Sequence, residues 1–126
     1  MSNYEKQIEK ILQKEKIIYI KEKTYSDLKH GLLRFDFYLP NKNCIIEIDG
    51  QQHFYQVKKF QRTRRDFLKQ QEHDRIKNSY CLANEIPLYR IPYWEFDSIT
   101  NINDIFKKKF RVTTRWHNDN LIMPKK

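Results

Sequence analysis

The stretch RFDFYLPNKNCIIEIDG, residues 34–50, predicts two β-strands folded back on each other at a short polar turn. Apolar and polar side chains alternate over residues 33–39, as they do in a strand that buries one face. Residues 40–43, Pro-Asn-Lys-Asn, supply the turn, because proline presets its own φ angle and asparagine tolerates unusual backbone angles. Residues 44–48 are almost continuously apolar, which is typical of an interior strand.

Three carboxylates gather on this predicted hairpin. A turn centred between Asn41 and Lys42 gives the cross-strand pairs Leu39 with Cys44, Asp36 with Glu47, and Arg34 with Asp49. Opposed side chains have Cβ atoms about 4.5–5.5 Å apart. Because side chains alternate between faces, Asp36, Glu47 and Asp49 all project from one face of the sheet. Carboxylates held this close repel each other and lose hydration.

Two interpretations of this acidic cluster stay open on the pattern alone. In the first, the cluster holds a cation, and a compact set of oxygen ligands favours Mg²⁺ or Mn²⁺ over zinc. In the second, Asp36 and Glu47 are solvated charges on the open face of the hairpin. The metal interpretation is favoured because Glu47 lies in an apolar run and because Gly50 and His53 follow at once.

The composition predicts one basic domain with an anionic partner. The chain has 126 residues, with 25 Lys and Arg against 16 Asp and Glu, a net charge of +9. Nucleic acid is the commonest partner of such a chain, and a soluble basic surface without a dedicated partner is the alternative. No apolar run approaches the roughly 20 residues of a membrane span, and the N-terminus lacks a signal-peptide pattern. We therefore expect a cytoplasmic protein with no membrane partner.

The cysteines and histidines do not predict a zinc site. Cys44 lies in a predicted buried strand and Cys81 in a predicted helix, so both are expected to be reduced core residues. His53, His73 and His117 are scattered between elements without zinc-site spacing.

The remaining elements are predicted from periodicity and capping signals. A helix over 2–16 begins with a capping box from Ser2 to Glu5, and Glu5 is either that cap or a further metal or water ligand. The further elements are a strand over 17–20, a long helix over 61–84, a strand over 88–91, a final helix over 96–110, and 112–114 as a candidate strand. This order predicts a single α/β domain over 1–126, with a mixed sheet flanked by helices and a basic C-terminal extension over 107–126.

A basic patch lies at the predicted start of the long helix. It consists of Lys58, Lys59, Arg62, Arg64 and Arg65, and the tail adds Arg111 and Arg115. Lys and Arg contacts to phosphates supply most sequence-independent affinity for nucleic acid. The alternative is a solvated helix start, although cations there oppose the helix dipole. We favour phosphate contacts.

The same long helix carries Asp74 and Lys77 three positions apart, hence on one face. They are either a surface ion pair or groups that face the acidic cluster, with Lys77 steering the scissile phosphate. The predicted packing stripe of this helix is formed by Ile76, Tyr80 and Ala83.

With these residues, the chain resembles the PD-(D/E)XK nuclease superfamily. Within it, the similar branch is that of the very-short-patch-repair endonuclease, which includes small phage- and intron-associated nucleases with an EDxHD motif. The matching segments are residues 35–37, 46–53, 74–77 and 88–93. The resemblance implies a restriction-endonuclease-like core of order αβββαβ and divalent-metal-dependent hydrolysis of phosphodiester bonds, usually in DNA.

The resemblance also implies site residues. Asp36 would be the principal metal ligand, joined by Glu47 or Asp49 and the backbone carbonyl of Ile48, while Glu5, His53 and Asp74 match the remaining motif positions. The superfamily pattern Glu-x-Lys is here Glu47-Ile48-Asp49, so Lys77 or His53 takes the role of the missing lysine, or the chain cleaves nothing. Chemically, His53 suits a general base or leaving-group acid, and Lys77 suits charge balance in the transition state.

The sequence therefore predicts a metal-dependent endonuclease that acts on DNA. One alternative is a catalytically silent nuclease-fold module that binds nucleic acid through its basic helix and tail, and another is a nuclease directed at RNA or junctions. A monomer with one site would nick one strand, whereas a homodimer would cut both. The resemblance to phage-type nucleases adds a phage-infected host cell to the expected setting.

Overall fold

The computed structural model of the chain describes residues 2–28, 33–50 and 64–113. Its elements are α1 (Asn3–Lys14), β1 (Ile20–Lys23), β2 (Phe35–Leu39), β3 (Cys44–Asp49), α2 (Arg64–Ala83), β4 (Leu88–Pro92), the 3-10 helix η2 (Tyr93–Ser98), α3 (Ile102–Ile105) and the 3-10 helix η3 (Lys108–Phe110). The protein is an α/β protein, as the sequence predicts.

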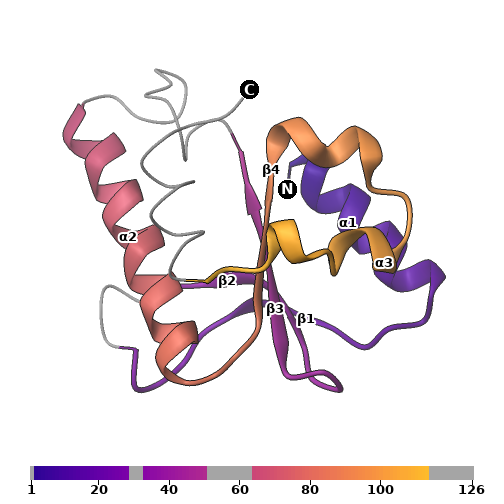
Figure 1. Ribbon diagram of the computed structural model, residues 1–126, viewed down its shortest axis with the longest axis horizontal. Coiled ribbons are helices and arrows are strands. Elements are labelled where there is room, and N and C mark those ends of the chain that lie inside the picture. The colour runs from indigo at the N-terminus through magenta and orange to yellow at the C-terminus, as the bar shows by residue number, and fades with distance from the viewer. Residues whose placement is uncertain (1, 29–32, 51–63, 114–126) are drawn as a thin grey trace.

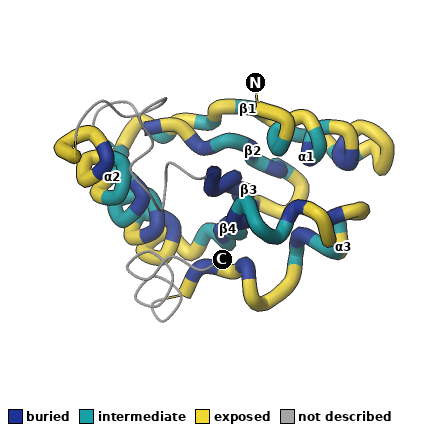
Figure 2. The backbone as a smooth tube through the Cα atoms, turned by 90° about the horizontal axis from the view of Figure 1, so that it is seen from above, coloured by how far each residue is buried: buried dark blue, intermediate teal, exposed yellow. Residues whose placement is uncertain are grey.

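The strands form one mixed sheet in the order β1-β2-β3-β4. β1 pairs with β2 and β2 with β3 in antiparallel fashion, whereas β3 and β4 are parallel and connected through α2. α2 covers one face of the sheet, and α1 and α3 lie on the other (Figure 1). β3 is buried along its whole length at the centre of these layers (Figure 2).

The predicted hairpin and its register are confirmed for the residues nearest the turn. Leu39 pairs with Cys44 and Phe37 with Ile46. Asn43 adopts a φ of 47°, a left-handed angle that asparagine tolerates better than most residues. The turn chemistry and the strand alternation therefore lead to the same pairing.

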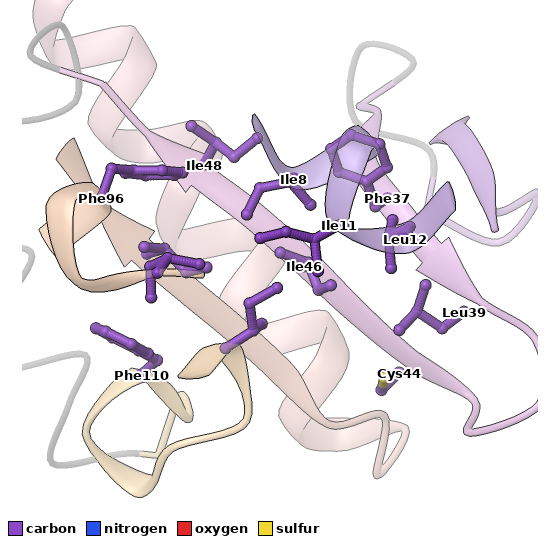
Figure 3. Close-up of a cluster of buried hydrophobic side chains, with 13 residues drawn as sticks. Ile8, Ile11, Leu12, Phe37, Leu39, Cys44, Ile46, Ile48, Phe96 and Phe110 are labelled. Atoms are coloured by element: carbon purple, nitrogen blue, oxygen red, sulfur yellow. The ribbon is translucent and has the colours of Figure 1, made fainter. Parts of the chain in front are cut away.

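The larger core cluster lies between the sheet and the pair of helices α1 and α3 (Figure 3). α1 contributes Ile8, Ile11 and Leu12 to it, and the sheet contributes side chains such as Phe37 and Ile46. A second, smaller cluster involves Phe35, Ile45, Cys81, Leu88 and Val112. Both cysteines are free and buried, which confirms the prediction of reduced core thiols.

The predicted first strand over 17–20 is wrong in its position. Ser2 caps α1 as predicted, since its Oγ accepts a hydrogen bond from the Glu5 backbone N–H at 3.1 Å. At the other end of the helix, Lys16 has a φ of 56° and the Ile17 N–H reaches back to the Leu12 carbonyl at 2.9 Å. Ile17 is used in this way for helix capping and for core contact, so the strand begins only at Ile20.

The predicted final helix over 96–110 is also wrong, because the chain forms three short helical turns there. Asn101 has extended backbone angles and forms a capping box with Asp104, so α3 starts inside the predicted helix. The predicted C-terminal extension starts with core residues, because Phe110 and Val112 are buried. The Val112 N–H bonds to the Leu88 carbonyl at 2.8 Å, and a single bridge pairs Tyr89 with Arg111 on β4.

Candidate active site

The two carboxylates of Asp36 and Glu47 bracket the point where the β2–β3 pairing ends. The paired residues run only as far as Phe37 and Ile46. Beyond them, the Asp36 backbone N–H donates to Glu47 Oε1 at 2.7 Å, and the Ile48 backbone N–H donates to Asp36 Oδ2 at 2.8 Å. Each side chain thus satisfies a backbone donor on the other strand. We call Asp36 and Glu47 the carboxylate bracket.

Lys77 supplies a cation to this bracket from the covering helix α2. Its Nζ lies 3.1 Å from Glu47 Oε2, and the two side chains are only 11% and 2% exposed. The same ammonium lies 5.3 Å from the centre of the Phe35 ring. Lys77 therefore faces the acidic cluster, as one of the two alternatives for Asp74 and Lys77 predicted. A buried ion pair of this kind loses hydration on both sides, so its geometry is held by the surrounding fold.

Asp36 is the carboxyl group of the site with the most altered acidity. Burial, and next the neighbouring Glu47 carboxylate, raise its pKa from 3.8 to about 8. The Ile48 N–H and the Lys77 ammonium oppose this shift, and the Glu5 charge adds to it weakly. Without a further cation, Asp36 therefore holds a proton near neutral pH. Proton retention by a buried carboxyl group is a frequent property of functional sites.

A second, fully buried network lies beside the bracket and is organised by Arg90 of β4. Arg90 Nη1 lies 2.6 Å from Asp49 Oδ1, and Arg90 Nε donates to Asn78 Oδ1 at 2.7 Å. Arg90 Nη2 is 3.4 Å from the Asp74 carbonyl and 3.5 Å from its carboxylate. We call Asp49, Asp74, Asn78 and Arg90 the Arg90 network, and each of its side chains is buried.

The predicted pairing of Arg34 with Asp49 is wrong. Arg34 instead lies 3.3 Å from Glu22 at the surface, because the strand ladder has ended before this position. Asp49 receives its cation from the parallel neighbour strand β4, where Arg90 pairs with Glu47 and reaches diagonally to Asp49, two residues further along β3.

The predicted packing stripe of α2 is confirmed only for Tyr80, which packs against the second core cluster. The buried residues of this helix are Phe67, Asp74, Asn78 and Cys81, whereas Ile76 and Tyr80 are half-buried and Ala83 is exposed. Two of these four inward positions are polar, so hydrophobic periodicity alone does not mark the buried face of the helix.

The Arg90 guanidinium stays charged although it is fully buried. Burial disfavours the cation, but Asp49, Asp74 and Glu47 more than offset this and hold its pKa above the ordinary value. An arginine within the apolar strand 88–92 was the signal that could have revealed the network.

Other predicted site residues are distributed around this centre. Glu5 lies in the first turn of α1, and Arg64 and Arg65 are exposed in the first turn of α2. Arg111 is exposed, with its guanidinium 5.9 Å from the Tyr89 ring centre. The residues that lie outside the described ranges are His53, Lys58, Lys59, Arg62 and Arg115.

The described residues at the bracket fit a hard divalent cation in their chemistry. Asp36 Oδ1 accepts no hydrogen bond from any described residue, and each oxygen of Glu47 retains a second lone pair beside its existing bond. Mg²⁺ is typically held by one or two carboxylates together with several waters. Within residues 2–28, 33–50 and 64–113, no cluster of three or more His, Cys, Asp or Glu side chains is arranged around a common metal position.

Comparison with known proteins gives one partial match. The chain is 31% identical over 61 residues to uncharacterized protein 307L of Invertebrate iridescent virus 6, a match that spans 48% of this chain and 31% of the viral protein. No protein-family model matches the chain, and no solved structure does. In the described part of the chain, no helix has the length and apolar character needed to cross a membrane.

Proposed function

We propose that this protein is a metal-dependent endonuclease that hydrolyses phosphodiester bonds in DNA, built on a restriction-endonuclease-like core. The observation that carries the proposal is the carboxylate bracket, in which two acids from neighbouring strands, the half-buried Asp36 and the buried Glu47, are held against each other. Two carboxylates held this close repel each other and lose hydration, so their opposition costs stability when both are ionised. The arrangement is therefore better explained by a cation that binds there during function.

The charge balance of the buried groups supports a divalent ion. The bracket and the Arg90 network contain four carboxylates, on Asp36, Glu47, Asp49 and Asp74, and two cations, on Lys77 and Arg90. Four negative charges against two positive charges leave a deficit of two when all carboxylates are ionised. The raised pKa of Asp36 is the response of the site when no ion compensates this deficit.

Asp36 is the principal candidate ligand, and Glu47 is the second. Asp49 is assigned a positioning role in this proposal because its carboxylate already binds Arg90. The Ile48 carbonyl and Glu5 remain further candidate ligands, as the resemblance implies. When bound, Mg²⁺ or Mn²⁺ supplies a Lewis acid for the phosphoryl group and an activated water.

Lys77 is proposed to balance charge at the site, and Asp36 and His53 are proposed to release or transfer protons. Lys77 lies close enough to Glu47 to fix its orientation and to balance negative charge that develops on a phosphoryl group at the bracket. Asp36 releases its proton when the ion binds, so metal affinity rises with pH up to about 8. His53 is proposed as the general base or leaving-group acid, and Asp74 as a positioning residue through the Arg90 network.

The net charge of +9 supports a polyanionic substrate. Arg64 and Arg65, exposed at the start of α2, are proposed to bind DNA phosphates together with Lys58, Lys59, Arg62 and Arg115. Arg111 belongs to the same proposed set.

A nucleic-acid-binding module without catalysis is the second candidate. It is favoured by one observation, namely that both oxygens of Glu47 and one of Asp49 already bind cations or a backbone donor. In that case Asp36 keeps its proton, and the carboxylate bracket has a structural role only.

The experiment that separates these candidates is cleavage of supercoiled plasmid in Mg²⁺, Mn²⁺ or EDTA. We compare the wild-type chain with Asp36→Asn, which keeps an acceptor for the Ile48 N–H, and with Asp97→Asn at an exposed aspartate. The nuclease proposal predicts metal-dependent nicking or linearisation that Asp36→Asn loses and Asp97→Asn retains. Cleavage that survives in Asp36→Asn would refute the assignment of the site. Retardation of DNA on a gel without cleavage, repeated with RNA and junction substrates, would favour the binding module.

A further inference from the structure

A surface hollow lies on the protein at the opposite end of β3 from the carboxylate bracket. It has a volume of about 390 Å³ and is lined by Lys42, Cys44, Pro87, Tyr89 and Phe106. Pockets of a few hundred cubic ångströms suit small organic groups. Cys44 belongs to the core cluster on the α1 side of the sheet, whereas Glu47 faces Lys77 of α2. The hollow is therefore separate from the candidate active site.

The chemistry of this hollow is set by two lining rings and the lining Lys42, together with Arg111, which lies against one of those rings. The rings of Tyr89 and Phe106 have centres 5.1 Å apart and are tilted by 53°. The Lys42 ammonium lies 5.4 Å from the centre of the Phe106 ring, and the Arg111 guanidinium lies 5.9 Å from that of Tyr89. Contacts of this kind are attractive and restrain the cations at the hollow.

The two cations carry positive charge that no described carboxylate neutralises. Among the ion pairs of the described residues, none involves Lys42 or Arg111. Both cations act on the same lining residue, Cys44. Burial raises the pKa of its thiol to about 11, and the charges of Lys42 and Arg111 oppose that rise. The hollow thus combines an aromatic wall, formed by Tyr89 and Phe106, with two positive charges beside these rings, on Lys42 and Arg111.

We propose that this hollow binds one nucleotide of a single-stranded nucleic acid, with the base against Tyr89 and Phe106 and a phosphate between Lys42 and Arg111. Aromatic side chains bind the faces of unstacked bases, and cations follow the backbone. A duplex keeps its bases stacked and cannot present one to a ring, so the aromatic wall favours a single strand. The proposal is independent of metal binding and of cleavage at the bracket.

The test is binding of a 3′-labelled pentathymidylate, followed by fluorescence anisotropy in EDTA, where cleavage cannot interfere. The charge variant is Lys42→Ala with Arg111→Ala, and its matched control is Lys10→Ala with Lys14→Ala, which removes two exposed charges from α1. We expect the charge variant to raise Kd at least about fivefold and the control to raise it less than about twofold. Phe106→Leu, which keeps an apolar wall and all charges, should also raise Kd at least about threefold.

The same variants are measured with a blunt duplex, with circular dichroism to verify that each one is folded. On the duplex, Phe106→Leu is expected to leave Kd unchanged, whereas the charge variant weakens binding there too, because Arg111 also belongs to the set proposed to bind DNA phosphates. Equal loss of pentathymidylate binding in both double variants would overturn the proposal, because the effect would then be general charge. Unchanged binding in a folded Phe106→Leu variant would overturn the role of the rings.

Discussion

Replacement of Arg90 by methionine tests the buried network that joins α2 to the sheet. Arg90→Met keeps most of the side-chain volume but leaves the Asp49 carboxylate, 2.6 Å from the lost guanidinium and fully buried, without that cation. Removal of one partner from a buried ion pair costs about 3–5 kcal/mol. Single domains have a total free energy of unfolding of about 5–15 kcal/mol, so the variant is expected to lose a large part of its stability.

Urea denaturation followed by circular dichroism measures this loss. With a slope of about 2 kcal/mol per molar urea, the midpoint should fall by about 2 M. The control is Arg75→Met, which breaks the exposed pair of Arg75 with Glu72 at 3.7 Å and should cost no more than about 1 kcal/mol. Combining Arg90→Met with Asp49→Leu should restore part of the stability, because the buried charge is removed as well. A loss in Arg90→Met no larger than that in Arg75→Met would refute the structural role of the network.

Three further predictions concern the acidity and capping of single groups. Burial and Glu47 hold the pKa of Asp36 at about 8 in the folded chain, above its ordinary 3.8, so the native state retains a proton that the unfolded chain releases. The free energy of unfolding in EDTA should therefore fall as pH rises from about 4 to about 8, by at most about 1.4 kcal/mol per pH unit from this group, and Asp36→Asn should flatten the fall. Ser2→Ala removes the acceptor for the Glu5 N–H and should cost about 1 kcal/mol in thermal unfolding, and an unchanged midpoint would contradict the cap. Burial raises the pKa of Cys44 to about 11 and that of Cys81 to about 12, so Ellman's reagent should label neither thiol at pH 8 until urea unfolds the chain.

Sequence predicts well the parts of the fold that are determined by residues close together in the chain. The hairpin follows from strand alternation and from the turn at Pro40 and Asn41, which are neighbours in the chain, and its register places Asp36 near Glu47. The spacing of Asp74 and Lys77 also places both on the inward side of α2.

The parts that sequence predicts poorly depend on contacts between distant segments. Asp49 is paired with Arg90, 41 positions further along the chain, and only the parallel pairing of β3 with β4 brings them together. The inward face of α2 carries Asp74 and Asn78, so its apolar residues do not mark its buried side. α1 ends and α3 begins at local capping interactions. Helix propensity alone would predict a longer helix at both positions.

The most direct test of the proposed function is manganese binding at the carboxylate bracket. Electron paramagnetic resonance of free Mn²⁺, titrated with the protein at pH 8, measures bound ion without any need for a nucleic-acid substrate. We predict one site per chain, whose affinity falls at least about tenfold in Asp36→Asn and is unchanged in Asp97→Asn. Binding should be weaker at pH 6, where Asp36 holds its proton. Equal Mn²⁺ binding by the wild-type chain and Asp36→Asn would contradict the assignment of Asp36 as the central ligand.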